Sequence, residues 1–341
     1  MKRLAQKISA GVACTAVLLV ALIVSEMAAG GERAKSISSP AATRRTVAAA
    51  VSSAPPVSTP KTAASAQTVV LTEKPDPAVV KDPEGLKAKI CSPEAILIRA
   101  DDGAVLLDKN AGQRVYPASM TKIMTALLAI EEVQSLDEKI TVNKALVDRL
   151  TNEDASLAGF SGGEQVSVRD LLYGALLPSG AECCVSLANR IESNETNFAR
   201  SMNLRAEQLG LKDTHFMNTT GLHDPDHYST VRDIAALLSY ALRNPTFRQV
   251  FTTLHYTTAP TNVNANGISF SSTMSRCLLS TQAGSATILG GKVGFTDQAG
   301  LCLASLASYG GHEYILVTAG VKDVYRGEIQ DAETVYGSLG N

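Results

Sequence analysis

Hydrophobic positions divide the chain into an N-terminal part without any period and a longer part with clear helix and strand patterns. Two apolar runs, 95–98 and 104–107, flank Asp101-Asp102-Gly103, a sequence typical of a β-hairpin turn. Apolar residues then recur at helical spacing, and strand-like runs return near the C-terminus. We predict helices that begin near Ser119 and cover 168–177, 181–191, 195–209, 230–242 and 324–336, and late strands at 286–290, 301–308 and 313–319.

The order of these elements predicts the fold class. Strands at both ends of the patterned region, with helices between them, favour an α+β domain. We expect one antiparallel sheet whose halves come from the two ends of the domain, with a helical insertion in the middle. The predicted domain covers 86–341, and the sequence shows no internal repeat.

The first thirty residues have the pattern of an export segment. Lys2, Arg3 and Lys7 precede an apolar run over 8–24, which small residues follow. The run is longer than most cleaved signals and shorter than a standard membrane span, so a signal peptide and a membrane anchor remain alternatives for 1–30. We therefore expect an exported protein that acts outside the cytoplasm, at the membrane or the cell wall, with possible N-terminal membrane association.

Residues 31–85 are rich in Ala, Ser, Thr and Pro, and their apolar positions show neither helix nor strand periodicity. Such a composition buries too little apolar surface to offset the entropy lost on ordering, so it predicts a disordered tether. The whole chain of 341 residues carries a net charge of −2. Because a phosphate backbone selects for a basic face, this balance argues against nucleic acid as a partner. Six cysteines in this length do not indicate a disulfide framework, although a pair between Cys91 and Cys302 stays open.

Candidate chemistry begins at Ser119. A helix that starts there places Lys122 one turn later on the same face. A serine hydroxyl with an amine within reach is a nucleophile and base pair that needs no histidine. Taken alone, however, a serine before an apolar helix is far more often an ordinary N-cap than a nucleophile.

Two later stretches of the sequence favour a catalytic role for Ser119. Ser179 lies in a predicted turn between two helices, and Lys292 lies in a strand flanked by glycines. S-x-x-K, then a serine turn, then K-x-G is the ordered motif set of active-site serine penicillin-binding enzymes and β-lactamases.

The chain from about Cys91 onward resembles the low-molecular-weight D-alanyl-D-alanine carboxypeptidases, which are penicillin-binding serine peptidases. Besides the three motifs, the segments 214–218, 221–233 and 296–300 are similar to this family. The resemblance implies a β-lactamase/DD-peptidase-like fold. It also implies that the chain binds peptidoglycan stem peptides ending in D-Ala-D-Ala, is acylated by β-lactam antibiotics, and uses no cofactor.

The resemblance implies roles for individual residues. Ser119 would be the acylated nucleophile, Lys122 the general base and Ser179 a proton relay. The oxyanion would lie between the backbone N–H groups of Ser119 and Phe295. The residues expected to bind substrate are Lys292, Phe295 through its backbone N–H, Thr296 and Arg326.

Two positions depart from the family pattern. Ala181 stands where the second motif usually has Asn, and Val293 stands where the third motif usually has Thr or Ser. Each change removes a hydrogen-bonding group that we expect near the substrate. The departures leave open a catalytically weak or silent wall-binding module. A β-lactamase is a weaker alternative, because nothing resembles its deacylating glutamate motif.

Metal chemistry is a further alternative. Residues of zinc-ligand type, His223, Asp224, Asp226 and His227, fall within five positions. They lie, however, in a segment that resembles the family and leads into a helix N-cap. We therefore expect structural roles for them and no metal site.

Overall fold

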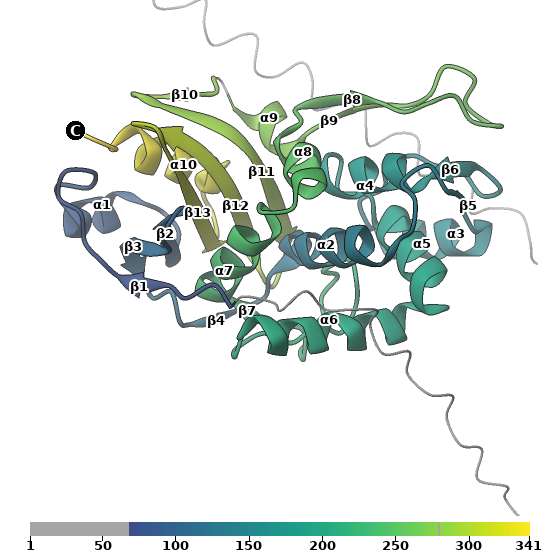
Figure 1. The fold of residues 1–341 in the computed structure, drawn as a ribbon, viewed down its shortest axis with the longest axis horizontal. Coiled ribbons are helices and arrows are strands. Elements are labelled where there is room, and N and C mark those ends of the chain that lie inside the picture. The colour runs from purple at the N-terminus through teal and green to yellow at the C-terminus, as the bar shows by residue number, and fades with distance from the viewer. Residues whose placement is uncertain (1–67, 279) are drawn as a thin grey trace, which may run out of the picture. The chain divides into compact units, whose positions relative to one another are not determined.

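A seven-stranded sheet organises the folded part of the chain, as seen in a computed structural model that describes residues 68–278 and 280–341 (Figure 1). Neighbouring strands are antiparallel except β1 and β3, which are parallel. Across the sheet, the strands are β1 (Thr72–Glu73), β3 (Ala104–Lys109), β2 (Glu94–Arg99), β13 (His312–Val321), β12 (Gly300–Tyr309), β11 (Ala286–Thr296) and β10 (Gln282–Ala283).

Both ends of the domain contribute to this sheet, as predicted. The hairpin of β2 and β3 turns at Gly103, whose φ of +70° favours glycine. Strand β13 joins the two halves, because it pairs with β2 on one side and with β12 on the other. The predicted α+β class is therefore confirmed, and β11 extends well beyond the predicted strand at 286–290.

A helical region lies beside the sheet and is inserted between β3 and β10 along the chain (Figure 1). At its centre is α2, in which every residue from Lys122 to Ala129 is buried. A helix buried on all sides needs partners all round, and α2 contacts α4, α5, α7 and α8. The helices of the region are α2 (Lys122–Glu132), α3 (Lys144–Asn152), α4 (Val168–Leu176), α5 (Ala181–Glu192), α6 (Glu195–Leu209), α7 (Val231–Ala241) and α8 (Pro245–Thr252), and the short α9 (Thr273–Cys277) follows and packs on β11.

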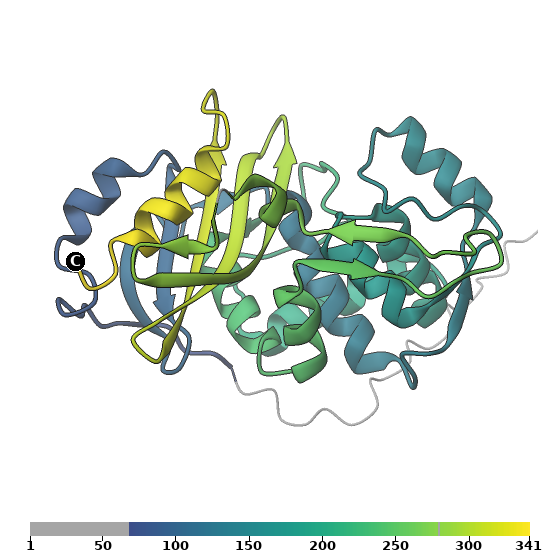
Figure 2. The same ribbon diagram turned by 90° about the horizontal axis from the view of Figure 1, so that it is seen from above.

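Three short strand pairs complete the helical region. They are β4 (Arg114–Val115) with β7 (Ser229–Thr230), β5 (Lys139–Thr141) with β6 (Gln165–Ser167), and β8 (His255–Thr257) with β9 (Ser269–Ser271). The β8–β9 hairpin reaches across the helices (Figure 2). Its tip is fixed near β6, where the Asn262 side chain accepts a hydrogen bond from the Gln165 N–H over 2.8 Å.

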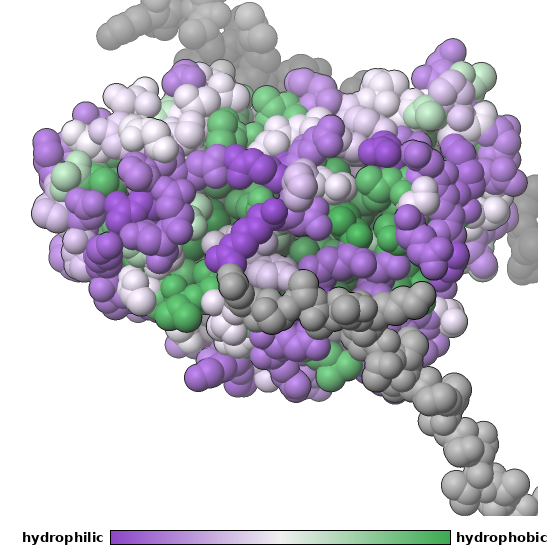
Figure 3. Space-filling model, viewed as in Figure 1, coloured by the Kyte–Doolittle hydropathy of each residue, from purple (hydrophilic) through white to green (hydrophobic). Residues whose placement is uncertain are grey.

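The sheet separates two hydrophobic clusters. Ile96 and Ile98 belong to the cluster shared with the helical region, whereas Ala95 and Leu97 belong to the cluster under α1 (Pro83–Lys89) and α10 (Gly327–Gly337). This division follows from the alternation of side chains along a strand. Figure 2 shows α1 and α10 on the side of the sheet away from the helical region. One face of the molecule is mostly polar, with separate apolar patches (Figure 3).

The folded part begins earlier than the predicted boundary at residue 86. Strand β1 pairs with β3, Val79 and Val80 are buried, and α1 begins after the side chain of Asp82 caps its first turn. The prediction of a tether over 31–85 is therefore wrong for its last part, and the parallel β1 was not predicted. The expected leader over 1–30 and the rest of the tether lie outside the described residues. Within 68–278 and 280–341, none of the helices combines the length and the apolar character that crossing a bilayer requires.

Asp331 of α10 ties the two ends of the domain together. Its carboxylate accepts hydrogen bonds from the N–H of Cys91 (2.6 Å) and from both the N–H (2.8 Å) and the hydroxyl (2.5 Å) of Ser92. Ser92 is fully buried just before β2, so these bonds replace water for backbone groups that would otherwise have no partner.

We expect Asp331→Ala to lower the free energy of unfolding by about 2–3 kcal/mol, because it leaves buried donors unsatisfied. Urea titration measures the change. Asp148→Ala is the matched control, since Asp148 is exposed and pairs only with Lys144 on its own helix. Equal effects of the two substitutions would contradict this account of Asp331.

Candidate active site

Ser119 lies in a single 3-10 turn, η1 (Ala118–Thr121), which leads directly into α2. Ala118 adopts a φ of +46°, an unfavourable value for a residue with a Cβ atom. The predicted helix start near Ser119 is thus a tight turn, and α2 itself begins at Lys122. Lys122 is only 2% exposed, and its Nζ lies 2.9 Å from Ser119 Oγ and 2.6 Å from the carbonyl oxygen of Thr220.

Ser179 occupies the turn between α4 and α5, as predicted. It is buried and has a φ of +72°, again unusual for a residue other than glycine. The turn is closed by a hydrogen bond from the Gly180 N–H to the Gly174 carbonyl over 2.8 Å. This geometry brings Ser179 Oγ to 3.0 Å from Ser119 Oγ.

Lys292 lies in the middle of β11 and is fully buried. Its Nζ donates to Ser179 Oγ over 3.0 Å and to the carbonyl of Val293 over 2.7 Å. The order Lys122, Ser119, Ser179, Lys292 is therefore an unbroken chain of polar contacts. Three segments far apart in sequence build it, and the structure brings together the four residues that the motifs singled out.

Burial dominates the electrostatics of both lysines. Removal from water lowers the pKa of Lys122, while nearby Cys184 and Glu182 oppose that shift. Burial also lowers the pKa of Lys292 far below its ordinary value, and the positive charge of Lys122 adds to the effect. Both shifts favour a neutral amine, which is the form that can accept a proton.

Two glycines allow the backbone to close around Ser119. Gly221 has a φ of +80°, and a Cβ atom there would lie 1.8 Å from the Ala118 carbonyl oxygen. On the other side, a Cβ atom on Gly294 would lie 3.1 Å from the Ser119 nitrogen. Strand β11 therefore runs directly beside the turn of the nucleophile, where the predicted oxyanion donors of Ser119 and Phe295 belong.

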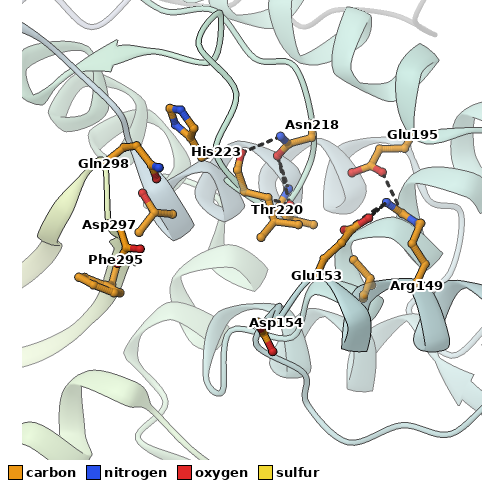
Figure 4. Close-up of a pocket in the computed structure, with 13 residues that line it drawn as sticks. Arg149, Glu153, Asp154, Glu195, Asn218, Thr220, His223, Phe295, Asp297 and Gln298 are labelled. Carbon is orange, nitrogen blue, oxygen red and sulfur yellow. Dashed lines mark hydrogen bonds and ion pairs between the residues drawn. The ribbon is translucent and has the colours of Figure 1, made fainter.

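A small cavity of about 70 Å³ opens at Ser119. It connects to a larger groove of about 700 Å³ through shared lining residues, among them Asp154, Leu222, Phe295 and Thr296 (Figure 4). The cavity is lined by Ser119, Lys122, Asp154, Ala155, Ser156, Ala181, Thr220, Gly221, Leu222, Phe295 and Thr296. The predicted position of Thr296 at the substrate is thus consistent with the geometry.

Arg326 stands apart from this arrangement. It precedes α10 with a φ of +56°, is half-buried, and lines neither the cavity nor the groove. Its predicted contact with the substrate remains a prediction. Sequence reasoning also missed residues that the structure does bring to the site. The Thr220 carbonyl accepts from Lys122, and residues 154–156 form part of the cavity lining. The only signal for Thr220 was its place next to the family-like segment 221–233.

The two departures from the motif pattern lie in different surroundings. Ala181 is buried and lines the cavity, so the missing amide would have been near the substrate. Val293 packs against the cluster under α10, because neighbouring side chains of a strand point to opposite faces and Lys292 faces Ser179. The expectation that the side chain at 293 lies near the substrate is therefore wrong.

The histidines of the possible metal segment have separate partners. His227 Nε2 lies 2.8 Å from Thr121 Oγ1, and its Nδ1 accepts from the Met217 N–H. Burial lowers the pKa of His227 to about 4, so the ring is neutral near pH 7. His223 packs edge-on against Tyr116. Among the described residues, no group of three metal-ligating side chains is arranged to hold an ion. Cys91 and Cys302 are both free thiols.

A protein-family model described as D-alanyl-D-alanine carboxypeptidase (Peptidase S11) matches residues 79–323, which include every motif residue of the site. The chain belongs to this D-alanyl-D-alanine carboxypeptidase family.

Individual relatives support this family assignment. The chain is 36% identical over 222 residues to a D-alanyl-D-alanine carboxypeptidase of Streptomyces sp. (strain K15), and the match covers 62% of this chain and 75% of that protein. It is 37% identical over 149 residues to D-alanyl-D-alanine carboxypeptidase DacF of Bacillus subtilis (strain 168). That match covers 44% of this chain and 38% of the Bacillus protein. The crystal structure of the Streptomyces K15 DD-transpeptidase superimposes with a TM-score of 0.66 at 33% identity, over 73% of this chain and 97% of that one.

The lysine pKa shift predicts how acylation of Ser119 depends on pH. Protonated Lys122 cannot accept the hydroxyl proton, so the rate rises with pH as the amine becomes neutral. Because burial lowers the pKa of Lys122, we expect the midpoint of this rise below the ordinary value of 10.5. Acylation by a labelled penicillin at a series of pH values measures it. A midpoint at or above 10.5 would show that the amine is not desolvated.

We expect Gly294→Ala to slow acylation by about 100-fold, because the added Cβ presses on the Ser119 backbone N–H. The fold should survive, since the φ of Gly294 lies outside the left-handed region. Gly112→Ala is the control, because a Cβ there meets no atom within 4 Å. Acylation rates and melting temperatures of both variants test the prediction. A Gly294→Ala protein that reacts as fast as the control would be inconsistent with the close approach of β11.

Proposed function

We propose that this protein is a serine-type D-Ala-D-Ala carboxypeptidase that removes the terminal D-alanine from peptidoglycan stem pentapeptides through an acyl-enzyme. The observation that carries the proposal is the contact chain from Lys122 through Ser119 and Ser179 to Lys292. It joins a nucleophile, a desolvated base and a hydroxyl relay at the mouth of a cavity, in a member of a family named for this activity.

The reaction begins when Ser119 Oγ attacks the carbonyl carbon of the penultimate D-alanine. The hydroxyl proton passes to neutral Lys122 Nζ, 2.9 Å away, and the carbonyl oxygen becomes an oxyanion. Backbone N–H groups of Ser119 and Phe295 are the proposed donors that stabilise it. The proton then reaches the leaving nitrogen through Ser179 Oγ, and the C–N bond breaks to release D-alanine.

The second half of the reaction regenerates the enzyme. Water attacks the ester carbon and transfers a proton to Lys122, and the released Ser119 oxygen recovers a proton from Lys122. Lys292 holds the Ser179 hydroxyl in place through a 3.0 Å contact and is a proposed partner of the terminal carboxylate of the substrate. Thr296, in the cavity lining, and Arg326 are the other proposed partners of that carboxylate.

The nature of the acceptor is part of the proposal. The Streptomyces K15 relative is named both a carboxypeptidase and a DD-transpeptidase, so the same acyl-enzyme is associated with water and with an amine acceptor. We favour water here, and an amine acceptor would divert the product from acid to amide. Peptidoglycan as substrate implies action outside the cytoplasm, which agrees with the export pattern of the N-terminal residues.

Labelling with a fluorescent penicillin, together with release of D-alanine from a synthetic pentapeptide ending in D-Ala-D-Ala, tests this function. We expect a covalent adduct and D-alanine release from the native protein. Ser119→Ala should lose both completely. Lys122→Ala should slow both by at least about 1000-fold with its melting transition intact, because the base is lost but the nucleophile remains.

The other outcomes separate the alternatives. No adduct at any penicillin concentration would indicate the silent wall-binding module, to which the apolar Ala181 in the cavity points. Rapid turnover of the penicillin would indicate a β-lactamase. An amide product in the presence of an added amino acid would indicate transfer rather than hydrolysis.

A further inference from the structure

Glu182 is a fully buried carboxylate three residues after Ser179, in the first turn of α5. One of its oxygens, Oε1, accepts hydrogen bonds from the N–H groups of Ala158 (2.7 Å), Gly159 (2.9 Å) and Phe160 (3.4 Å). The other oxygen, Oε2, is buried and has no hydrogen-bond partner among the described residues. A carboxylate bonded only to N–H groups accepts without donating, as an ionised group does. Burial raises the pKa of Glu182 above its ordinary value, and the hydrogen bonds from these N–H groups oppose that shift.

The segment that Glu182 holds, residues 154–160, also forms part of the catalytic cavity. Residues 154–156 at its start belong to the lining, and the Ser156 carbonyl accepts from the Ala181 N–H over 2.8 Å. Gly180 packs so closely on this segment that a Cβ atom there would lie 2.7 Å from the Cβ of Ala158. Glu182 therefore fixes this segment and the Ser179 turn against each other.

The charge of Glu182 also acts on Lys122, whose pKa it raises. The titratable groups that interact electrostatically with the Lys122 amine are Glu182, Cys183 and Cys184 of α5, Glu195 of α6, Lys292 of β11 and His227 of the loop before β7. Burial raises the pKa of Cys184 to about 12 and that of Cys183 well above its ordinary value, so both thiols are neutral near pH 7. His227 is neutral as well.

Among the described groups that shift the pKa of Lys122, two are carboxylates, Glu182 and Glu195. Glu195 is bonded to Thr219 through its carboxylate and lies 3.5 Å from the guanidinium of Arg149, so its charge is shared with a cation. Within the part of the chain that the structure describes, Glu182 is bonded to no cation, so its charge is available to Lys122.

We propose that Glu182 is a positioning residue for acylation, which fixes the 154–160 segment as a cavity wall and supplies a buried negative charge next to Lys122. The inference rests on the proposed acyl transfer at Ser119. It adds a second requirement to the S-x-x-K chemistry, namely that the serine turn carries its own anchored carboxylate.

Two substitutions separate the anchor from the charge. Glu182→Gln keeps the shape and the Oε1 acceptor but removes the charge. We expect the midpoint of the pH profile of penicillin acylation to move to lower pH by about one unit, because loss of an anion destabilises the ammonium form of Lys122. Glu182→Asp keeps the charge but shortens the reach. It should leave the midpoint in place and lower the plateau rate at least tenfold. Glu207→Gln, at an exposed position of α6, should change neither.

Hydrogen exchange tests the anchor without any substrate. In the full-length protein, the amides of Ala158, Gly159 and Phe160 should exchange at least tenfold faster in Glu182→Asp than in the native protein or Glu207→Gln. Unchanged exchange, or a Glu182→Gln profile with native midpoint and plateau, would overturn the proposal. Unfolding of Glu182→Gln would also overturn it, since the residue would then belong to the core alone. If the native protein forms no penicillin adduct, the proposed function fails, whereas the exchange experiment still decides the role of the anchor.

Discussion

Removal of water from the Lys122 amine is the condition on which the proposed chemistry depends. An ammonium ion cannot accept a proton from serine. Burial shifts the equilibrium of Lys122 toward the neutral amine because it penalises the charged form. The amine retains two short contacts, to the Ser119 hydroxyl and to the Thr220 carbonyl. Both contacts are to neutral oxygens, so nothing at hydrogen-bond distance restores the full stability of the charge. At the far end of the contact chain, burial and the charge of Lys122 lower the pKa of a second lysine, Lys292.

The fold keeps water away by placing the site where the sheet meets the helical region. Helix α2 is buried along most of its length, so its first residue, Lys122, begins deep in the molecule. Strand β11 closes the other side with Gly294, and Gly221 lets the following loop press against the same turn. The unusual backbone angles at Ala118 and Ser179 are consistent with this compression, because packing from both sides is needed to hold them. Glu182 extends the same principle to the cavity wall.

The sequence predicted the parts of this arrangement that follow from local patterns. Periodicity located α4 to α7 and the strands around Lys292, and motif order identified the four residues that meet. It did not predict β1 or α1, because residues 72–89 are rich in charged residues and Pro, lack helix or strand periodicity, and pack on β3 and α10 only in the folded domain. Helices α3 and α8 were missed in the same way, since neither carries a long apolar stripe.

The direction in which a side chain points, and its tertiary contacts, could be determined only from the structure. The motif suggested that position 293 lies beside the substrate, but the alternation of β11 turns Val293 into the α10 cluster. The carbonyl of Thr220 is a backbone atom, which no residue pattern reveals. Arg326 was chosen by a partial likeness of its surroundings, 325–328, to the family's arginine, and such a likeness does not determine whether a side chain reaches a cavity.

The most direct test of the central claim is a titration of Lys122 itself. In protein labelled with 13C at the lysine Cε atoms, the Lys122 resonance can be assigned by its absence from Lys122→Ala and followed with pH by NMR. The account predicts a pKa below the ordinary value of 10.5, so that the neutral amine forms at a lower pH than in an exposed lysine. A pKa at or above that value would contradict it, because an amine that stays protonated cannot take the proton from Ser119.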